Sequence, residues 1–197
     1  MKNRILEEIR KNGLCIADDV YQYGMFILIH YLIFTIISFV LCLKLGCIKE
    51  MAIFLISFYF IRKYVGGFHF NNSRICTIFT VLFITLFSFL ASEIQISLFF
   101  YIVIVFLIII MIDKIGCIEH KNKKLSKKEK IAYKRKAIRI IIIYLIIGFA
   151  TRLFRIFIVV NVLGSMLIFM IINILIGVFV NKRKDNSEVN DNENSNF

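Results

Sequence analysis

The chain has 197 residues, of which 59% are hydrophobic, and it carries a formal net charge of +12. Several apolar runs are too long and too continuous for a soluble domain or for the alternating strands of an outer-membrane barrel. The composition therefore predicts an all-α integral membrane protein. The five cysteines form no C-x-x-C pair and no ligand cluster with the three histidines. This spacing argues against a zinc site or a disulfide framework, and we expect no metal and no cofactor.

The N-terminal segment, residues 1–24, carries eight charges before the first apolar run, which does not fit a cleavable signal peptide. Its apolar residues recur on one helical face, and this favours a helix lying at the membrane surface over a leader into the first span. The first span is expected at residues 25–43. His30 lies within it, and we interpret His30 as a structural residue that hydrogen-bonds a neighbour.

Five further apolar segments follow, so the sequence predicts about six transmembrane helices. They comprise residues 51–61, 76–91, 94–112, 138–150 and 156–180. Two of these segments, residues 51–61 and 138–150, are short. The 11 apolar residues of the first cover only about half of a bilayer core. A tight turn is predicted at Ser92-Glu93. Residues 25–181 are thus interpreted as one polytopic membrane domain, and the polar residues 182–197 as a disordered tail.

The basic residues predict the topology. If all six segments cross the membrane and both termini are cytoplasmic, 21 of the 25 lysines and arginines lie inside and 4 lie outside. If the two short segments were re-entrant, the loop at residues 114–139, which holds 11 of them, would lie outside. The positive-inside rule favours six crossings.

Residues 62–69 concentrate the chemistry of the chain: they read Arg-Lys-Tyr-Val-Gly-Gly-Phe-His, and Cys76 follows seven residues after the histidine. Gly66 and Gly67 allow the backbone to turn through φ > 0 at no steric cost. With Ser73 as the N-cap of the next helix, Cys76 falls in the first turn, where the helix dipole stabilises a thiolate. An imidazole beside it would complete a pair of nucleophile and base.

The spacing of His69 and Cys76 limits how they can meet. On one unbroken helix, residues seven apart are separated by about 10 Å along the axis, too far for a hydrogen bond. We therefore expect His69 on a loop that folds back over the start of the Cys76 helix. The alternative is that His69 is an interfacial loop histidine and Cys76 a buried small hydrophobe, which is the commoner fate of a free cysteine.

The basic loop at residues 114–139 contains Ser-Lys-Lys-Glu at residues 126–129, which predicts a helix that starts with a capping box and leads into the fifth span. The cationic surface around Lys127, Lys128 and Lys130 would hold an acidic peptide or anionic lipid head groups. The alternative is that these lysines bind nothing and only fix the topology of the chain in the membrane. Nothing else in the chain resembles a base-reading module, so nucleic acid is not an expected partner.

The motif of residues 62–69 with Cys76 resembles the signature of the accessory gene regulator B (AgrB) family. Its members are membrane-embedded cysteine endopeptidases that mature the propeptides of bacterial cyclic autoinducers. The likeness extends over most of the chain: Tyr23-Gly24 is similar to the start of the family's first span, and residues 119–125 resemble its Asn-Lys-Pro-Leu stretch. The sequence departs from that stretch at Lys124, where the family has proline. This departure concerns the loop's shape and the propeptide it accepts, not the His–Cys pair.

The resemblance implies that Cys76 is the nucleophile and His69 its base. Arg62 and Gly67 match positions that the family pattern holds near this pair, and backbone N–H groups near Gly66 would be candidates for an oxyanion hole. The implied reaction is cleavage of a short quorum-sensing propeptide through a thioester, after which a substrate Cys or Ser closes a thiolactone or lactone ring. It also implies a multi-pass protein of the bacterial cell membrane whose active site lies at the cytoplasmic face.

Two other classes of function compete with this interpretation. A small transporter or holin-like protein would use the Gly-Gly-Phe-His motif as a structural turn, but transporters carry ionisable residues at mid-membrane, and here only His30 lies well inside a span. A metallopeptidase is disfavoured because the chain has no H-E-x-x-H motif. The expected partners are a propeptide and the lipid bilayer. The sequence also allows a homodimer, because Gly164-Ser165 would let helices of two copies approach closely.

Overall fold

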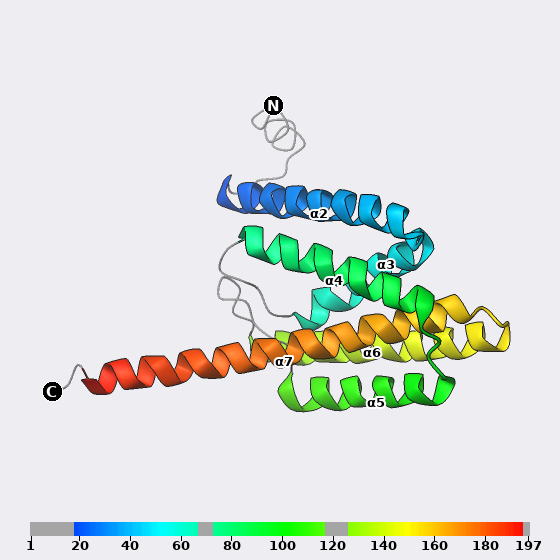
Figure 1. Ribbon diagram of the computed structural model, residues 1–197. Helices are drawn as coiled ribbons and strands as arrows, with labels where there is room; N and C mark the ends of the chain where they lie inside the picture. Colours follow the sequence, from blue (N-terminus) through cyan, green and yellow to red (C-terminus); the bar gives the residue numbers. More distant parts are fainter. Residues whose placement is uncertain (1–17, 67–72, 117–125, 195–197) are drawn as a thin grey trace, which may run out of the picture.

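The computed structural model describes residues 18–66, 73–116 and 126–194, and this part of the chain is built from six helices without a strand (Figure 1). The helices are α2 (Asp18–Leu45), α3 (Ile48–Val65), α4 (Ser73–Glu93), α5 (Leu98–Ile115), α6 (Lys127–Leu153) and α7 (Phe157–Asn194). Four of them, α2, α4, α5 and α7, are long and apolar enough to cross a membrane. The predicted all-α membrane fold is therefore confirmed.

The chain reverses direction at each connection between helices (Figure 1). The end of α3, the start of α4, the end of α5 and the start of α6 lie together at one end of the bundle, with the start of α2 and the C-terminal part of α7 (Figure 1). The other end holds only the short connections from α2 to α3, α4 to α5 and α6 to α7. This alternation is the arrangement that six crossings require, whereas the side of the membrane that each end faces stays a prediction.

The two segments that the sequence marks as short, α3 and α6, are longer in the structure than their apolar runs. Helix α3 has 18 residues, or about 27 Å, which nearly matches the roughly 30 Å of a bilayer core. Its charged residues lie in its first and last turns, with Glu50 at the start and Arg62 and Lys63 at the end. Long basic side chains can reach the interface from such positions, so the helix extends beyond its apolar residues.

The predicted turn at Ser92-Glu93 is wrong. Both residues belong to the last turn of α4, and the connection to α5 comprises residues 94–97. Ser97 caps α5 by accepting a hydrogen bond from the backbone N–H of Phe100. The backbone N–H of Ile96 donates to Oδ1 of Asn161 on α7 at 3.0 Å, so this connection is held by a distant helix rather than by turn residues.

The two ends of the chain also differ from the sequence-based boundaries. Helix α2 begins at Asp18, so residues 18–24 continue directly into the first span, and the rest of the predicted surface segment lies outside the described residues. Helix α7 continues to Asn194 and protrudes beyond the other helices, although residues 182–197 were predicted to be disordered (Figure 1). Starting a helix is the costly step, whereas extending an existing helix adds one backbone hydrogen bond per residue. A polar segment can therefore continue the helix of the apolar segment before it.

Helix α7 forms the centre of the bundle: 56% of its apolar stretch is buried, against 12–33% for the other three apolar helices. At its middle, the ring of Phe169 lies 5.3–6.0 Å from the rings of four phenylalanines of α3 and α4. These five residues, which we call the phenylalanine cluster, are Phe54, Phe58, Phe83, Phe87 and Phe169. Their packing fixes α3, α4 and α7 against one another.

A second contact fixes α5 and α6 through two buried tyrosines. The hydroxyl of Tyr101 donates to the carbonyl oxygen of Tyr144 at 2.6 Å, and the hydroxyl of Tyr144 donates to the carbonyl oxygen of Ser57 at 2.7 Å. Gly164 packs here too, since a Cβ on it would lie 2.7 Å from Cδ1 of Ile96. Gly164-Ser165 thus serves packing within the chain and gives no support to a homodimer, which stays a prediction.

Candidate functional site

The site begins at the turn that ends α3. Gly66 has φ 75° and ψ −149°, and its backbone N–H donates to the carbonyl oxygen of Arg62 at 3.0 Å. This combination of angles is essentially restricted to glycine, because a Cβ would collide with the backbone. The first glycine of the motif is therefore needed to turn the chain away from α3. Gly67 and His69, the other predicted residues of this loop, lie outside the described residues.

Cys76 lies in the first turn of α4, as the sequence predicted. Ser73 is the first residue of the helix rather than its N-cap, a shift of one position that leaves Cys76 as the fourth helical residue. The side chain of Cys76 is partly buried, and its carbonyl oxygen accepts a hydrogen bond from Oγ1 of Thr80 at 2.8 Å. This position keeps the sulfur near the positive end of the helix dipole.

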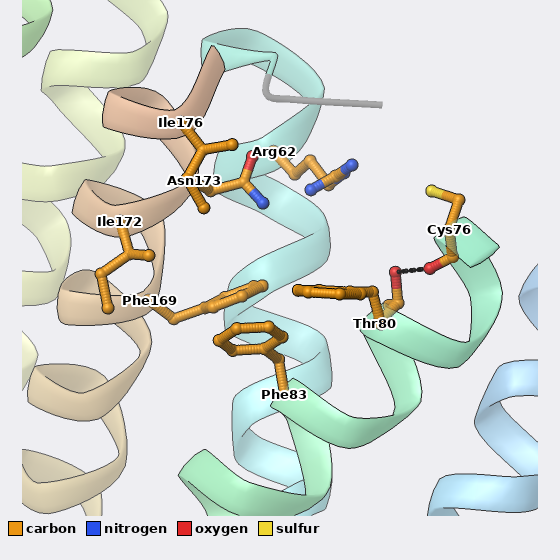
Figure 2. Close-up of a pocket in the computed structure, with 9 residues that line it drawn as sticks. Arg62, Cys76, Thr80, Phe83, Phe169, Ile172, Asn173 and Ile176 are labelled. Carbon is orange, nitrogen blue, oxygen red and sulfur yellow. Dashed lines mark hydrogen bonds between the residues drawn. The ribbon is translucent and has the colours of Figure 1, made fainter. Parts of the chain in front are cut away.

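Arg62 and Cys76 line one pocket between the end of α3, the start of α4 and the middle of α7 (Figure 2). The pocket has a volume of about 40 Å³, enough for a few water molecules or a small side chain. Figure 2 shows the Arg62 side chain extending toward Cys76. The guanidinium carbon also lies 5.1 Å from the centre of the Phe58 ring, which holds the head group by a cation–π contact. The structure thus brings together two of the predicted site residues.

The third polar side chain in the pocket, Asn173 of α7, was missed by the sequence interpretation. It lies beside Arg62 on the side away from Cys76 (Figure 2). A signal for it exists, because Asn173 is, with Asn161, one of two amides within the mostly apolar run of the last span, and polar residues inside spans often mark functional sites. That signal does not say which other helices the amide faces.

The predicted basic surface forms the start of α6 rather than part of the pocket. Ser126 and Glu129 make the predicted capping box, with bonds of 3.3 Å from the Glu129 N–H to Oγ and 2.8 Å from the Ser126 N–H to Oε2. Lys128 and Lys130 are exposed in this first turn. Lys127 is its first residue, and its side chain lies outside the described part of the chain.

The start of α6 is tied to the neighbouring helix ends. Nζ of Lys134 lies 2.8 Å from Oδ1 of Asp113 at the end of α5. Tyr133 contacts the ring of Tyr64 edge-on, with centroids 5.7 Å apart, and Nζ of Lys136 lies 5.6 Å from the same ring. Because Tyr64 stands two residues before Gly66, the basic start of α6 and the glycine turn are parts of one surface at the same end of the bundle.

The comparison with known proteins identifies the family of the chain. The sequence model for accessory gene regulator B matches residues 2–179. Two AgrB-like proteins of Clostridium perfringens, from strains SM101 and 13, are 30% and 31% identical to the chain over 137 residues. Each match covers 66% of this chain but only 64% of the relative's own length. No solved structure matches the chain. Since the family model covers most of the chain, including the glycine turn, Arg62 and Cys76, the chain belongs to the AgrB family.

Proposed function

We propose that this protein is a membrane-embedded cysteine endopeptidase that processes a short autoinducer propeptide, with Cys76 as nucleophile and His69 as base. One observation carries the proposal: Cys76 lies in the first turn of α4 and shares a pocket with Arg62, at the bundle end where Gly66 turns the chain. Membership in the AgrB family supports this role for the chain.

Two features with positive charge lie near Cys76. The start of α4 presents the positive end of a helix dipole, and the guanidinium of Arg62 lines the same pocket as Cys76. Both features suit the role of a cysteine nucleophile, which acts as a thiolate. A base supplied by His69 would take the thiol proton, which is the pairing that activates cysteine nucleophiles in general.

The proposed reaction is acyl transfer in two steps. The Cys76 thiolate attacks a backbone carbonyl of the propeptide, the C–N bond breaks, and the protonated His69 gives its proton to the departing amine. The thioester that remains is then attacked by a Cys or Ser side chain of the substrate, which closes a ring and releases the Cys76 thiolate. Exchange of one thioester for another roughly conserves bond energy, so ring closure to a thiolactone requires no separate energy source. Arg62 lines the pocket and is a candidate for binding the negative charge that develops on the carbonyl oxygen of the substrate.

The end of the bundle that holds the pocket is proposed to face the cytoplasm. Arg62, Lys63 and the basic first turns of α6 lie at this end. Among the residues that the structure describes, the basic residues near the other end are Lys44, Lys49, Arg152 and Arg155. This asymmetry supports the positive-inside orientation. Both termini would then be cytoplasmic, and a propeptide lying on the inner surface of the membrane would present its scissile bond directly to Cys76.

The test is co-expression with the product of the short reading frame next to the gene, carrying an epitope tag. Cleavage would be followed on gels for the wild type, Cys76→Ala, Cys76→Ser and His69→Ala. We expect cleavage to disappear in all three variants at normal membrane levels, because each variant lacks the thiolate or its base. Persistent cleavage by Cys76→Ala would end the cysteine-peptidase proposal and favour a non-catalytic protein in which the glycine motif is a structural turn.

A second part of the proposal concerns Lys127, Lys128 and Lys130, which we expect to hold the acidic part of the propeptide. The exposed positions of Lys128 and Lys130 beside the glycine turn support this role. Replacing all three with Gln should slow cleavage and reduce its dependence on salt, since exposed charges are screened over about 10 Å at 0.1 M salt. An unchanged rate with unchanged salt dependence would leave these lysines with a role in topology alone.

A further inference from the structure

The turn that ends α6 has an arginine at a position where glycine is usual. The backbone N–H of Ile156 donates to the carbonyl oxygen of Thr151 at 2.8 Å, and the N–H of Arg155 donates to the carbonyl oxygen of Arg152 at 3.1 Å. These two bonds define a Schellman motif, in which the residue after the helix takes a positive φ and is usually glycine. Here that residue is Arg155, with φ 60°.

The end of α2 shows that the chain builds the same kind of turn with glycine elsewhere. The N–H of Cys47 donates to the carbonyl oxygen of Cys42 at 3.0 Å, the N–H of Gly46 donates to that of Leu43 at 3.4 Å, and Gly46 has φ 74°. A side chain makes this backbone conformation less favourable, whereas glycine adopts it freely. The strained backbone at Arg155 therefore points to a role for its side chain and not for the turn alone.

The side chains around this turn are apolar and exposed. Phe154 is 78% exposed and Leu153 is 70% exposed. Phe99, in the first turn of α5 at the same end of the bundle, is 72% exposed (Figure 1). No other large hydrophobic residue in the described part of the chain is as exposed as these three. Side chains of this kind belong in hydrocarbon, so the charge of Arg155 lies at the boundary between the hydrocarbon and the head groups.

The length of α6 and the contacts of the two arginines agree with this depth. Helix α6 rises by about 20 Å between Arg139 and Arg152, less than the roughly 30 Å of a bilayer core. The guanidinium carbon of Arg152 lies 4.5 Å from the centre of the Phe157 ring, a cation–π contact that leaves the N–H edges available. Within the described residues, neither Arg152 nor Arg155 forms an ion pair with a carboxylate. Two positive charges thus meet an apolar surface without a counter-charge from these residues.

We propose that Arg152 and Arg155 bind the phosphate of an anionic phospholipid, whose acyl chains lie against Leu153 and Phe154. A guanidinium fits phosphate because its N–H groups donate to two oxygens at once. The site lies at the end of the bundle away from Cys76, and it depends neither on the proposed catalysis nor on the orientation in the membrane, because both leaflets contain phosphate. Each arginine near a membrane surface should strengthen the binding of anionic lipid by about fivefold.

The test is native mass spectrometry of the full-length protein in detergent, titrated with phosphatidylglycerol or with zwitterionic phosphatidylcholine. The wild type should bind its first phosphatidylglycerol at least fivefold more tightly than phosphatidylcholine. Arg152→Gln with Arg155→Gln should remove this preference. The matched control is Lys44→Gln with Lys49→Gln, which removes the same charge from exposed residues at the same end and should keep it. Equal binding of both lipids by the wild type, or equal losses in the two double variants, would overturn the proposal.

The single variant Arg155→Gly separates the role of the side chain from that of the backbone. Glycine suits a positive φ, so the Tm in lipid-free detergent should be unchanged or higher, while the affinity for phosphatidylglycerol should fall about fivefold. Wild-type affinity in this variant would exclude Arg155 as a lipid ligand. A lower Tm would show that the arginine is not strained in the turn, which would remove the reason for assigning it a role.

Discussion

The turn at Gly66 offers a sharp test of how the site is assembled. With φ 75° and ψ −149°, the position suits glycine alone, and an L-residue there costs about 1–3 kcal/mol. Gly66→Ala must either keep this strained turn or relax it by moving the chain that follows, which carries His69. If the turn relaxes, the fraction of molecules with the active arrangement falls by about 5- to 150-fold for that free energy.

The matched control is Gly46→Ala. Gly46 has φ 74°, nearly the same as Gly66, and a Cβ on it would meet nothing within 4 Å. It lies between α2 and α3, at the end of the bundle away from the pocket (Figure 1). Both substitutions place an alanine at a positive φ, but only the one at Gly66 acts on the proposed site.

The assay combines propeptide cleavage on gels with thermal unfolding of the purified protein in detergent. Gly66→Ala should lower the cleavage rate at least fivefold, whereas Gly46→Ala should cleave at close to the wild-type rate even though its own positive φ lowers the Tm. Equal losses of cleavage in both variants would show that the effect comes from general destabilisation. Wild-type cleavage by Gly66→Ala would show that the turn does not set the geometry of the site.

Two further substitutions test the packing between α5 and α6 and the cap of α6. In Gly148→Ala, the new Cβ would lie 2.7 Å from Cζ of Tyr101, which is fully buried and hydrogen-bonded to Tyr144, so we expect a loss of about 1–3 kcal/mol, measured as a lower Tm in detergent. Ser126→Ala removes the cap of α6 and should cost about 1 kcal/mol, whereas Ser126→Asp should retain most of it, measured by protection of the first amides of α6 from hydrogen exchange. A Gly148→Ala protein as stable as the wild type would mean that the Tyr101 ring can move aside. Equal exchange in both Ser126 variants would mean that contacts such as Lys134 with Asp113 hold the helix start without the cap.

Much of the local structure was predictable because its causes lie within short stretches of sequence. The capping box is an example: Ser126 and Glu129 are three residues apart, and each satisfies a backbone N–H of the same helix turn. His30 is another, since its Nδ1 pairs with the carbonyl oxygen of Phe26 one turn away at 2.9 Å, as expected for a structural histidine. Such bonds depend on helical spacing alone and need no knowledge of the remaining chain.

The errors arose where contacts between distant segments decide the outcome. The connection from α4 to α5 contains Ile94 and Ile96, which look like parts of a span, yet Asn161 on another helix binds the backbone of Ile96 and keeps it irregular. The sequence predicts that the second span ends at residue 61, where the apolar run ends, whereas α3 continues to Val65. Its last turn is charged, and the cation–π contact of Arg62 with Phe58 is visible only once the helix is built.

The sequence by itself determined the membrane-spanning class, the helices and the family, and it singled out Cys76 and His69 by their residue types and spacing. These properties follow from local composition, periodicity and motif, which a linear chain displays directly. The tertiary structure decided that Arg62 and Cys76 share a pocket, that Asn173 joins them from about 100 residues away, and that the phenylalanine cluster closes the floor beneath them. The physical reason is that side-chain packing selects which faces of α3, α4 and α7 meet, and no single helix carries that information.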